Sequence, residues 1–406
     1  MAPFHTCHSV KTSYEGQTNI NGWPRSPPET RRRSHERKTT SLLGYPIATE
    51  ADQTEMEREK DPCRQSQTEV QSTVHNISCD CNVELKTANC TGRNFEHLPA
   101  SLPASTEQLD LSHNHLSDIT PRFFQTARRL RVLLLNDNVI RVLANGAFFL
   151  LEDLLKLDLS RNRISSLSEG FSLGLGSLRE LSLAENKLTV LDSNGFVHLD
   201  SLQKLNLSHN GIKTIKMRAF GSTSTLRQIQ LDWNNITVLT NGIFSMLPNL
   251  EVLNLQHNQI HSLDDGTLSP LTSLVLLDLT NNNLSSIQFK TFLSLNTYST
   301  HIILRGNPWK CDCDLQRVFR KLCNVKRLFL DDYDDLSCSD LDEIHGYSMG
   351  FDTELCVAEM VTVLVITLTV FITVVAALVM AEKKRKKKVQ EKHWTEVSDM
   401  SCTSQD

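Results

Sequence analysis

The residues with the clearest capacity for chemistry are three histidines that each come directly before an asparagine. They are His113, His209 and His257. A zinc site needs several ligands about 2 Å from one ion. We expect these histidines to lie on different strands of one sheet, the nearest pair separated by roughly 10 Å. The sequence therefore predicts surface histidines here and not a metal site.

Other signatures of catalysis are missing from the sequence, which contains no glycine-rich phosphate loop, zinc-finger spacing or nucleophile elbow. The 406 residues include 42 Lys+Arg and 47 Asp+Glu, for a formal net charge of −5. This balance excludes a protein that coats nucleic acid. We expect no enzymatic activity, cofactor, metal, nucleic acid or small-molecule substrate, and partners that are proteins.

An internal repeat defines the elements that must position any functional residue. Asparagines recur every 24 residues in the frame Leu-x-x-Leu-x-Leu-x-x-Asn-x-Leu, at Asn114, Asn138, Asn162, Asn186, Asn210, Asn234, Asn258 and Asn282. Ten residues after six of them comes a phenylalanine, at Phe124, Phe148, Phe196, Phe220, Phe244 and Phe292. Repeat 7 has Leu268 at this place, and repeat 3 has Phe171 one residue earlier.

This spacing predicts a stacked architecture. Each unit supplies one short strand, a turn and an irregular return, and it cannot bury its leucines alone. Stacking places the strands about 4.8 Å apart over a continuous apolar core. We expect each asparagine to satisfy backbone groups where the chain turns inward, and the phenylalanines to fill the far side of the core.

The repeat resembles the leucine-rich-repeat family of extracellular proteins with cysteine-bearing caps. The resemblance implies an α/β solenoid, a horseshoe of eight 24-residue repeats with disulfide caps, plus one transmembrane helix. We place an N-terminal cap at 76–104, the repeats at 105–297 and a C-terminal cap at 298–356. Residues 1–75, which are polar and carry no repeat, are expected to be disordered or to be a misassigned start of the sequence.

The resemblance also implies how the cysteines pair, and such disulfides require an oxidising compartment. One family cysteine is replaced by His75, so Cys63 is the nearest candidate to take its place. For Cys323 we expect a buried free thiol rather than a reactive one. The implied bridges are Cys79–Cys90, Cys63–Cys81, Cys311–Cys338 and Cys313–Cys356.

A membrane span is indicated by 21 residues without a charge, from Val361 to Ala381. We place the transmembrane helix at 357–381 and a cytoplasmic basic tail at 382–406. The residues expected to anchor this topology, and to contact lipid, are Lys383, Lys384, Arg385, Lys386, Lys387 and Lys388. Positive-inside logic predicts a single-pass type I protein of the plasma membrane. Residues 1–75 show no apolar leader core, so we expect a wrong upstream exon or start site, or else insertion directed by the span itself.

The outward positions of the strands are the expected binding surface. Lys156, Glu180 and Lys204 alternate in sign across adjacent strands, and Arg161 and Glu185 do so one column away, which favours a role in stabilising the sheet. Better candidates for protein contact are the apolar residues Val132, Leu134, Trp233, Val252 and Leu276. Sequons for N-glycosylation occur at Asn76, Asn89, Asn206, Asn235 and Asn283. Asn206 falls on the strand face, where a glycan would block its middle.

These observations predict a cell-surface protein that acts as an adhesion molecule or co-receptor. The layout resembles that of trophoblast glycoprotein. The alternative is an auxiliary subunit that modulates a channel or receptor in the same membrane through its span and basic run, as the layout of gamma subunits of large-conductance potassium channels implies.

Overall fold

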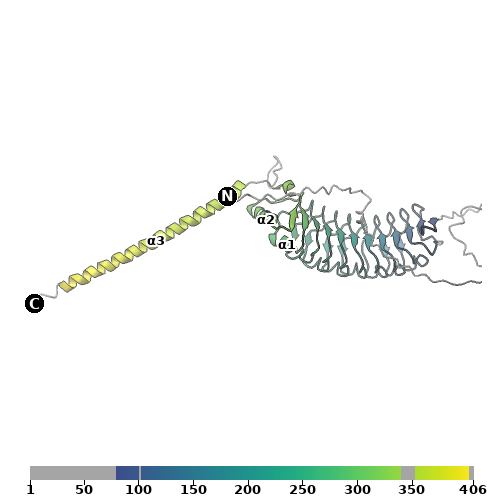
Figure 1. The fold of residues 1–406 in the computed structure, drawn as a ribbon, viewed down its shortest axis with the longest axis horizontal. Coiled ribbons are helices and arrows are strands. Elements are labelled where there is room, and N and C mark those ends of the chain that lie inside the picture. The colour runs from purple at the N-terminus through teal and green to yellow at the C-terminus, as the bar shows by residue number, and fades with distance from the viewer. Residues whose placement is uncertain (1–78, 100–101, 340–352, 402–406) are drawn as a thin grey trace, which may run out of the picture.

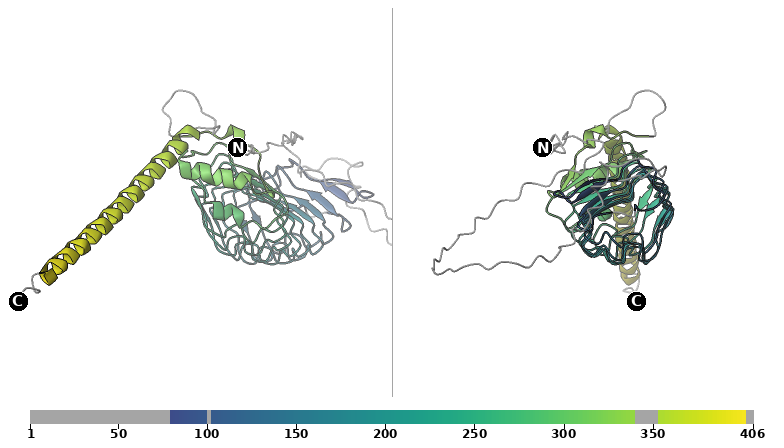
Figure 2. Two further views of the ribbon diagram at one scale, coloured as in Figure 1. Left: turned by 60° about the vertical axis from the view of Figure 1, so that its left-hand side comes forward. Right: turned by 90° about the vertical axis from the view of Figure 1, so that its right-hand side faces the viewer.

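The computed structural model describes residues 79–99, 102–339 and 353–401. Within them the repeats form a solenoid with one long sheet along one side (Figure 1). The end-on view in Figure 2 shows the turns of the chain stacked over one another, so each repeat contacts its two neighbours. The predicted solenoid of leucine-rich repeats is confirmed.

The long sheet has 12 strands, and all neighbours in it are parallel except β1 and β2. Its order is β1 (Asp80–Asn82), β2 (Thr87–Asn89), β3 (Gln108–Asp110), β5 (Val132–Leu134), β7 (Lys156–Asp158), β8 (Glu180–Ser182), β10 (Lys204–Asn206), β12 (Gln228–Gln230), β14 (Val252–Asn254), β16 (Leu276–Asp278), β17 (Thr300–Ile303) and β18 (Leu328–Leu330). From β3 to β16 each residue pairs with the one 24 positions later, for example Leu205 with Ile229. The sequence period therefore sets the strand register directly.

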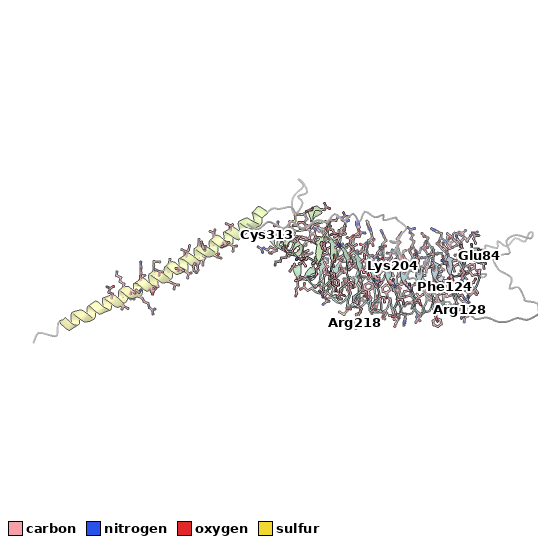
Figure 3. All side chains as sticks on the ribbon, in the orientation of Figure 1. Glu84, Phe124, Arg128, Lys204, Arg218 and Cys313 are labelled. Carbon is pink, nitrogen blue, oxygen red and sulfur yellow. A yellow bond between two sulfur atoms is a disulfide. The ribbon has the colours of Figure 1, made fainter. Side chains whose placement is uncertain are left out.

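The returning chain is built mostly from turns, with short strand pairs and one helix. The pairs are β4 (Asp118–Ile119) with β6 (Val142–Leu143), β9 (Val190–Leu191) with β11 (Thr214–Ile215), and β13 (Val238–Leu239) with β15 (Ser262–Leu263). The eighth repeat returns through α1 (Phe289–Leu293). Figure 3 places Lys204 on the sheet and Arg218 along the opposite edge, in the returning chain.

The repeat asparagines satisfy the backbone where each strand ends, as their spacing predicts. Asn186 is 9% exposed, and its Nδ2 donates to the carbonyl oxygens of Leu159 (2.9 Å), Leu183 (3.1 Å) and Ala184 (3.2 Å). Its Oδ1 accepts from the backbone N–H of Ile164 (3.0 Å). Each asparagine thus joins two consecutive turns of the solenoid, and buried polar groups of the backbone stay paired.

The phenylalanine column fills the far side of the core. Phe196 stacks on Phe220 with ring centroids 5.8 Å apart, and Phe220 stacks on Phe244 at 6.4 Å. Phe124 and Phe148 stack in the same way at 5.9 Å. These rings are 1% exposed or less, so the column forms an apolar spine under the returning chain.

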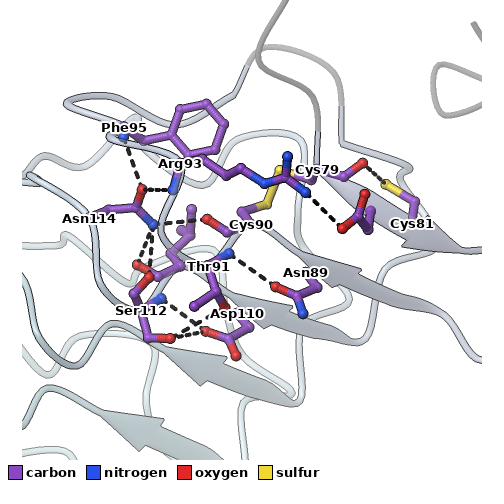
Figure 4. Close-up of a disulfide and its surroundings, with 12 residues drawn as sticks. Cys79, Cys81, Asn89, Cys90, Thr91, Arg93, Phe95, Asp110, Ser112 and Asn114 are labelled. Atoms are coloured by element: carbon purple, nitrogen blue, oxygen red, sulfur yellow. Dashed lines mark hydrogen bonds and ion pairs between the residues drawn. A yellow bond between two sulfur atoms is a disulfide. The ribbon is translucent and has the colours of Figure 1, made fainter. Parts of the chain in front are cut away.

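The N-terminal cap closes the first repeat through a disulfide and an ion pair (Figure 4). Cys79 and Cys90 are bonded, which is the pair that the resemblance implies. The first repeat asparagine, Asn114, donates to the carbonyl oxygen of Cys90 at 2.9 Å, and Arg93 pairs with Asp80 at 2.7 Å. The cap strand therefore joins the same hydrogen-bond ladder that connects the repeats.

The C-terminal cap is centred on α2 (Cys313–Cys323), which begins where the side chain of Asp312 accepts from the backbone N–H of Leu315 at 2.9 Å. One face of α2 is buried, and its Phe319 meets the fully buried Trp309 edge to face at 5.6 Å. A short 3-10 helix, η1 (Tyr333–Asp335), completes the cap. The cap thus covers the last repeat with aromatic side chains.

The cysteines of the caps follow the implied pairing where both partners are described. Cys311 is bonded to Cys338. Cys81, Cys313 and Cys323 are also disulfide-bonded. The expectation of a free thiol at Cys323 is therefore wrong: it is half-buried and oxidised, and the regularity of the helix face gave no sign of a bridge. Residues 1–75, including Cys63, and also Asn76 and the side chain of Cys356 lie outside the described residues.

The last element is α3 (Thr353–Ser401), a continuous helix of 49 residues. Within the described residues it holds the one segment that is long and apolar enough to cross a membrane, Val361–Gln390. The basic run from Lys383 to Lys388 continues the same helix without a break.

Candidate functional site

The sheet face of the repeats is the surface on which the predicted contact residues lie. We use this term for the outward side chains of β3 to β16 and the four residues that follow each strand. In the long-sheet strands β5, β7, β8, β10, β12, β14 and β16 the middle residue is buried and the two flanking residues are half-exposed. Each repeat therefore presents side chains at fixed positions, and equivalent positions form columns along the solenoid.

The middle of the sheet face is occupied by charges that pair with one another. Glu180 lies 2.9 Å from Lys204 and 4.0 Å from Lys156, and Arg161 lies 3.0 Å from Glu185. The side-chain hydrogen bond with Glu185 is the main reason why the pKa of Arg161 is raised. Exposed pairs of this kind contribute about 0–1 kcal/mol each. The structure thus supports the interpretation of these ladders as sheet-stabilising contacts.

The apolar candidates lie in two separate parts of the sheet face. Val132 and Leu134 flank the buried residue of β5 near the N-terminal cap. Val252 and Leu276 are partners in register on neighbouring strands near the C-terminal cap. Trp233 follows β12 and is 48% exposed, as its position in the repeat predicts.

Sequence reasoning missed that Trp233 belongs to a ladder of stacked rings. His209 stacks on it with centroids 5.4 Å apart and His257 with centroids 3.9 Å apart, both nearly parallel to it. We call these three residues the ring ladder. The shared column of the histidines was visible in the sequence, and noticing that Trp233 occupies the same position one repeat away would have predicted the stack.

Sequence reasoning also missed that the row of register partners formed by Val252 and Leu276 continues into the C-terminal cap. His301 of β17 is the register partner of Leu276, and Phe329 of β18 is the partner of His301. The two rings stack at 5.1 Å, and Asp331 holds the imidazole with oxygens at 2.9 and 3.0 Å from Nδ1. The 24-residue period ends before β17, so spacing alone could not align these residues.

A polar hollow of about 360 Å³ lies at the edge of the first repeats, where the strands begin. It is lined by Glu107, Arg129, Arg131, Asp153, Leu155 and Ser177. A hydrogen bond from Lys86 is the main cause that lowers the pKa of Glu107. The hollow carries charges of both signs, and it does not distinguish one class of ligand.

His113, His209 and His257 lie on separate turns of the solenoid, after β3, β10 and β14. Among residues 79–99, 102–339 and 361–390, no three His, Cys, Asp or Glu side chains are placed to hold an ion. The glycosylation candidates Asn89, Asn235 and Asn283 are exposed, whereas Asn206 is half-buried in β10 and its Oδ1 accepts from the backbone N–H of Ser208 at 3.0 Å. Their modification stays a prediction.

Comparison with known proteins agrees with this architecture. Three stretches of the chain, 104–164, 152–212 and 224–284, match the protein family described as "Leucine rich repeat". The chain carries leucine-rich repeats. The human 5T4 structure (Wnt-activated inhibitory factor 1, Trophoblast glycoprotein) has the same fold, with a TM-score of 0.51 and 23% identity, covering 67% of this chain and 94% of that chain.

Two curated relatives are each similar to a short stretch of this chain. Amphoterin-induced protein 3 of Rattus norvegicus is 40% identical over 74 residues, which are 18% of this chain and 15% of that protein. Leucine-rich repeat-containing protein 3 of Danio rerio is 37% identical over 73 residues, which are 18% of this chain and 27% of that protein. The chain thus spans less than a third of the length of either relative.

A buried carboxyl group in the C-terminal cap predicts how stability depends on pH. Asp332 is 6% exposed, and its Oδ2 accepts from the backbone N–H groups of Leu304 (2.8 Å) and Arg305 (2.6 Å). Its Oδ1 is buried and has no hydrogen-bond partner in the part of the chain that the structure describes. Burial raises the pKa of Asp332 and outweighs these bonds. The folded state therefore holds this proton more tightly than the unfolded chain, in which the pKa is about 3.9.

The stabilising effect of this proton is complete below the unfolded pKa and is lost as the pH rises through the raised folded value. We expect Asp332→Asn to flatten the fall in melting temperature as the pH rises above the unfolded pKa of about 3.9. Circular dichroism of the full-length chain at several pH values measures this, with the exposed Asp334→Asn as control. Equal pH profiles for wild type and Asp332→Asn would contradict the assignment.

Proposed function

We propose that this chain is a cell-surface protein that binds another protein through its sheet face, as an adhesion molecule or co-receptor without catalytic activity. In this proposal α3 spans the plasma membrane once, the repeats lie outside the cell and the basic run lies in the cytosol. The chain needs no cofactor for this role, and its partner is a protein ligand.

One observation carries the proposal. Apolar side chains lie exposed or half-exposed on a face whose middle holds charges that are paired with one another. Trp233 is 48% exposed just after β12, and Val252 and Leu276 begin the next two strands of the sheet, β14 and β16. Tryptophan is enriched among the few residues that contribute most of the binding energy at protein interfaces, whereas exposed ion pairs contribute little.

A double variant at the C-terminal apolar pair tests the proposal. Val252→Glu/Leu276→Glu places two charges where a partner would exclude water, so we expect at least a tenfold loss of partner capture, equivalent to about 1.4 kcal/mol. The measurement is cross-linking capture at the surface of cells that express the full-length chain, normalised to surface expression.

Met217→Glu serves as the matched control, because Met217 is 64% exposed on the returning chain and lies off the sheet face. Equal loss in both variants, or no loss in either, would overturn binding through the sheet face.

A second candidate function is supported by α3. Its apolar segment runs without a break into the basic residues from Lys383 to Lys388, so a neighbouring membrane protein could be contacted by one rigid helix. We propose this auxiliary-subunit role as the alternative. Replacing residues 361–381 by polyleucine would abolish capture in that case, while the sheet-face variant would retain it.

A further inference from the structure

Four amide side chains gather on two neighbouring strands of the sheet face. Gln228 and Gln230 flank the buried residue of β12, Asn254 ends β14, and Gln256 lies two residues after it. The register pairs Gln230 with Asn254, so the two strands bring the amides together. All four are half-buried. We call them the amide patch.

Most hydrogen-bonding capacity of the amide patch is unused within the part of the chain that the structure describes. Among the described residues, the side-chain amides of Gln228, Gln230 and Gln256 have no hydrogen-bond partner. Asn254 accepts from the backbone N–H of Gln256 at 3.1 Å and donates to Asp232 at 3.4 Å. This differs from the charged columns of the middle repeats, whose side chains neutralise one another.

The patch therefore presents donors and acceptors of equal number and no net charge. Each side-chain amide carries a carbonyl acceptor and an NH₂ donor. The N–H of a peptide group can donate to that carbonyl, and its C=O can accept from that NH₂ group. The patch itself contains no lysine or arginine, and the neighbouring Asp232 is 9% exposed, with a pKa raised by burial. Its chemistry matches a polypeptide main chain better than a charged ligand.

Apolar groups border the patch on both sides. Val252 and Leu276 lie at the beginning of β14 and β16, and the ring ladder follows the strands at their other end. Both faces of the Trp233 ring are covered by His209 and His257, which leaves its edge open. A sugar would need an open ring face for stacking, whereas aliphatic and aromatic side chains of a peptide can pack against edges and methyl groups.

The backbone conformation at Trp233 is unusual for a bulky side chain. Its φ is +54°, and every residue in this column has a positive φ. Asparagine, aspartate and histidine tolerate this conformation, and they occupy five of the eight positions of the column, as at His209, His257 and Asn281. A bulky tryptophan is disfavoured there, so the exposed ring contributes something other than local backbone preference.

We propose that the amide patch binds the main chain of an extended polypeptide segment, whose side chains pack against Val252 and Leu276 on one side and the ring ladder on the other. The inference rests on the proposed function and specifies its ligand. The segment is recognised through its N–H and C=O groups, and it carries uncharged, largely apolar side chains.

The test uses a phage-displayed library of linear 12-residue peptides, selected on the full-length chain in detergent. We expect selected peptides to lose affinity roughly tenfold on the variants Gln230→Leu and Gln256→Leu, which keep the size of the side chain and remove the amide. N-methylation of single backbone amides in the peptide is expected to cause a similar loss at the contacted positions. Ser182→Ala, in the equivalent column on β8, is the control that leaves affinity unchanged.

The possible outcomes separate this inference from the proposed function. If peptides bind and are lost on Val252→Glu but not on Gln230→Leu or Gln256→Leu, the face binds protein and the amide patch is not the site. If no linear peptide is selected, or if ligands appear only on a glycan array, recognition of an extended main chain is overturned. Melting temperatures of all variants show whether a loss reflects unfolding.

Discussion

Replacing Asn258 with alanine is expected to lower the free energy of unfolding by about 3–5 kcal/mol, because four hydrogen bonds are lost and buried backbone groups remain unpaired. The side chain is 8% exposed, and its Nδ2 donates to the carbonyl oxygens of Leu231 (2.9 Å), Leu255 (3.0 Å) and Gln256 (3.3 Å). Its Oδ1 accepts from the backbone N–H of Ile236 at 3.0 Å. Urea denaturation of the full-length chain, followed by circular dichroism, measures the change.

The neighbouring residue provides a matched control for this substitution. The side chain of Gln259 is exposed, and its backbone N–H donates to the carbonyl oxygen of Ile236, a bond that an alanine at this position would keep. Gln259→Ala should therefore change stability by less than about 0.5 kcal/mol. Similar losses for the two variants would show that the asparagine contributes no more than a generic surface residue, and the ladder would not be a main source of stability.

The substitution Phe220→Ala is expected to cost about 3–5 kcal/mol, because it leaves a cavity in the spine of the core. The ring is 1% exposed and lies between Phe196 and Phe244, with centroid distances of 5.8 and 6.4 Å. A solenoid is stabilised mainly by contacts between neighbouring turns, so the cavity weakens two interfaces together. The same urea denaturation measures this loss of stability, and we expect the variant to unfold at a lower midpoint concentration of urea.

Two further variants separate packing from loss of an aromatic ring. Phe220→Leu refills much of the volume and should cost less than half as much as the alanine variant. Phe149→Ala, at a phenylalanine that is 56% exposed on the returning chain, should have little effect. A loss at Phe149 as large as that at Phe220 would argue against the buried column as the principal core.

The repeat spacing was sufficient to predict most of the fold. A constant period of 24 residues brings equivalent positions into one column, so the strands, their register and the buried asparagines follow from the sequence. The Phe220 column and the paired Lys204 and Glu180 follow for the same reason. The repeat frame also identified the apolar contact candidates, and Trp233 is exposed at the position where the frame predicts an exposed side chain.

What the period cannot decide is how side chains within and between columns satisfy one another. Only the coordinates show that Trp233 is covered on both ring faces, and that the glutamines of the amide patch lack partners among the described residues. The caps depart from the 24-residue period, so only the structure shows that His301 and Phe329 continue the row of register partners that includes Leu276. For the same reason only the structure shows that Cys323 is disulfide-bonded. The sequence by itself determined the solenoid and its columns, since stacking equal units is a one-dimensional problem. The tertiary structure decided which side chains remain available for binding, since that depends on contacts in three dimensions.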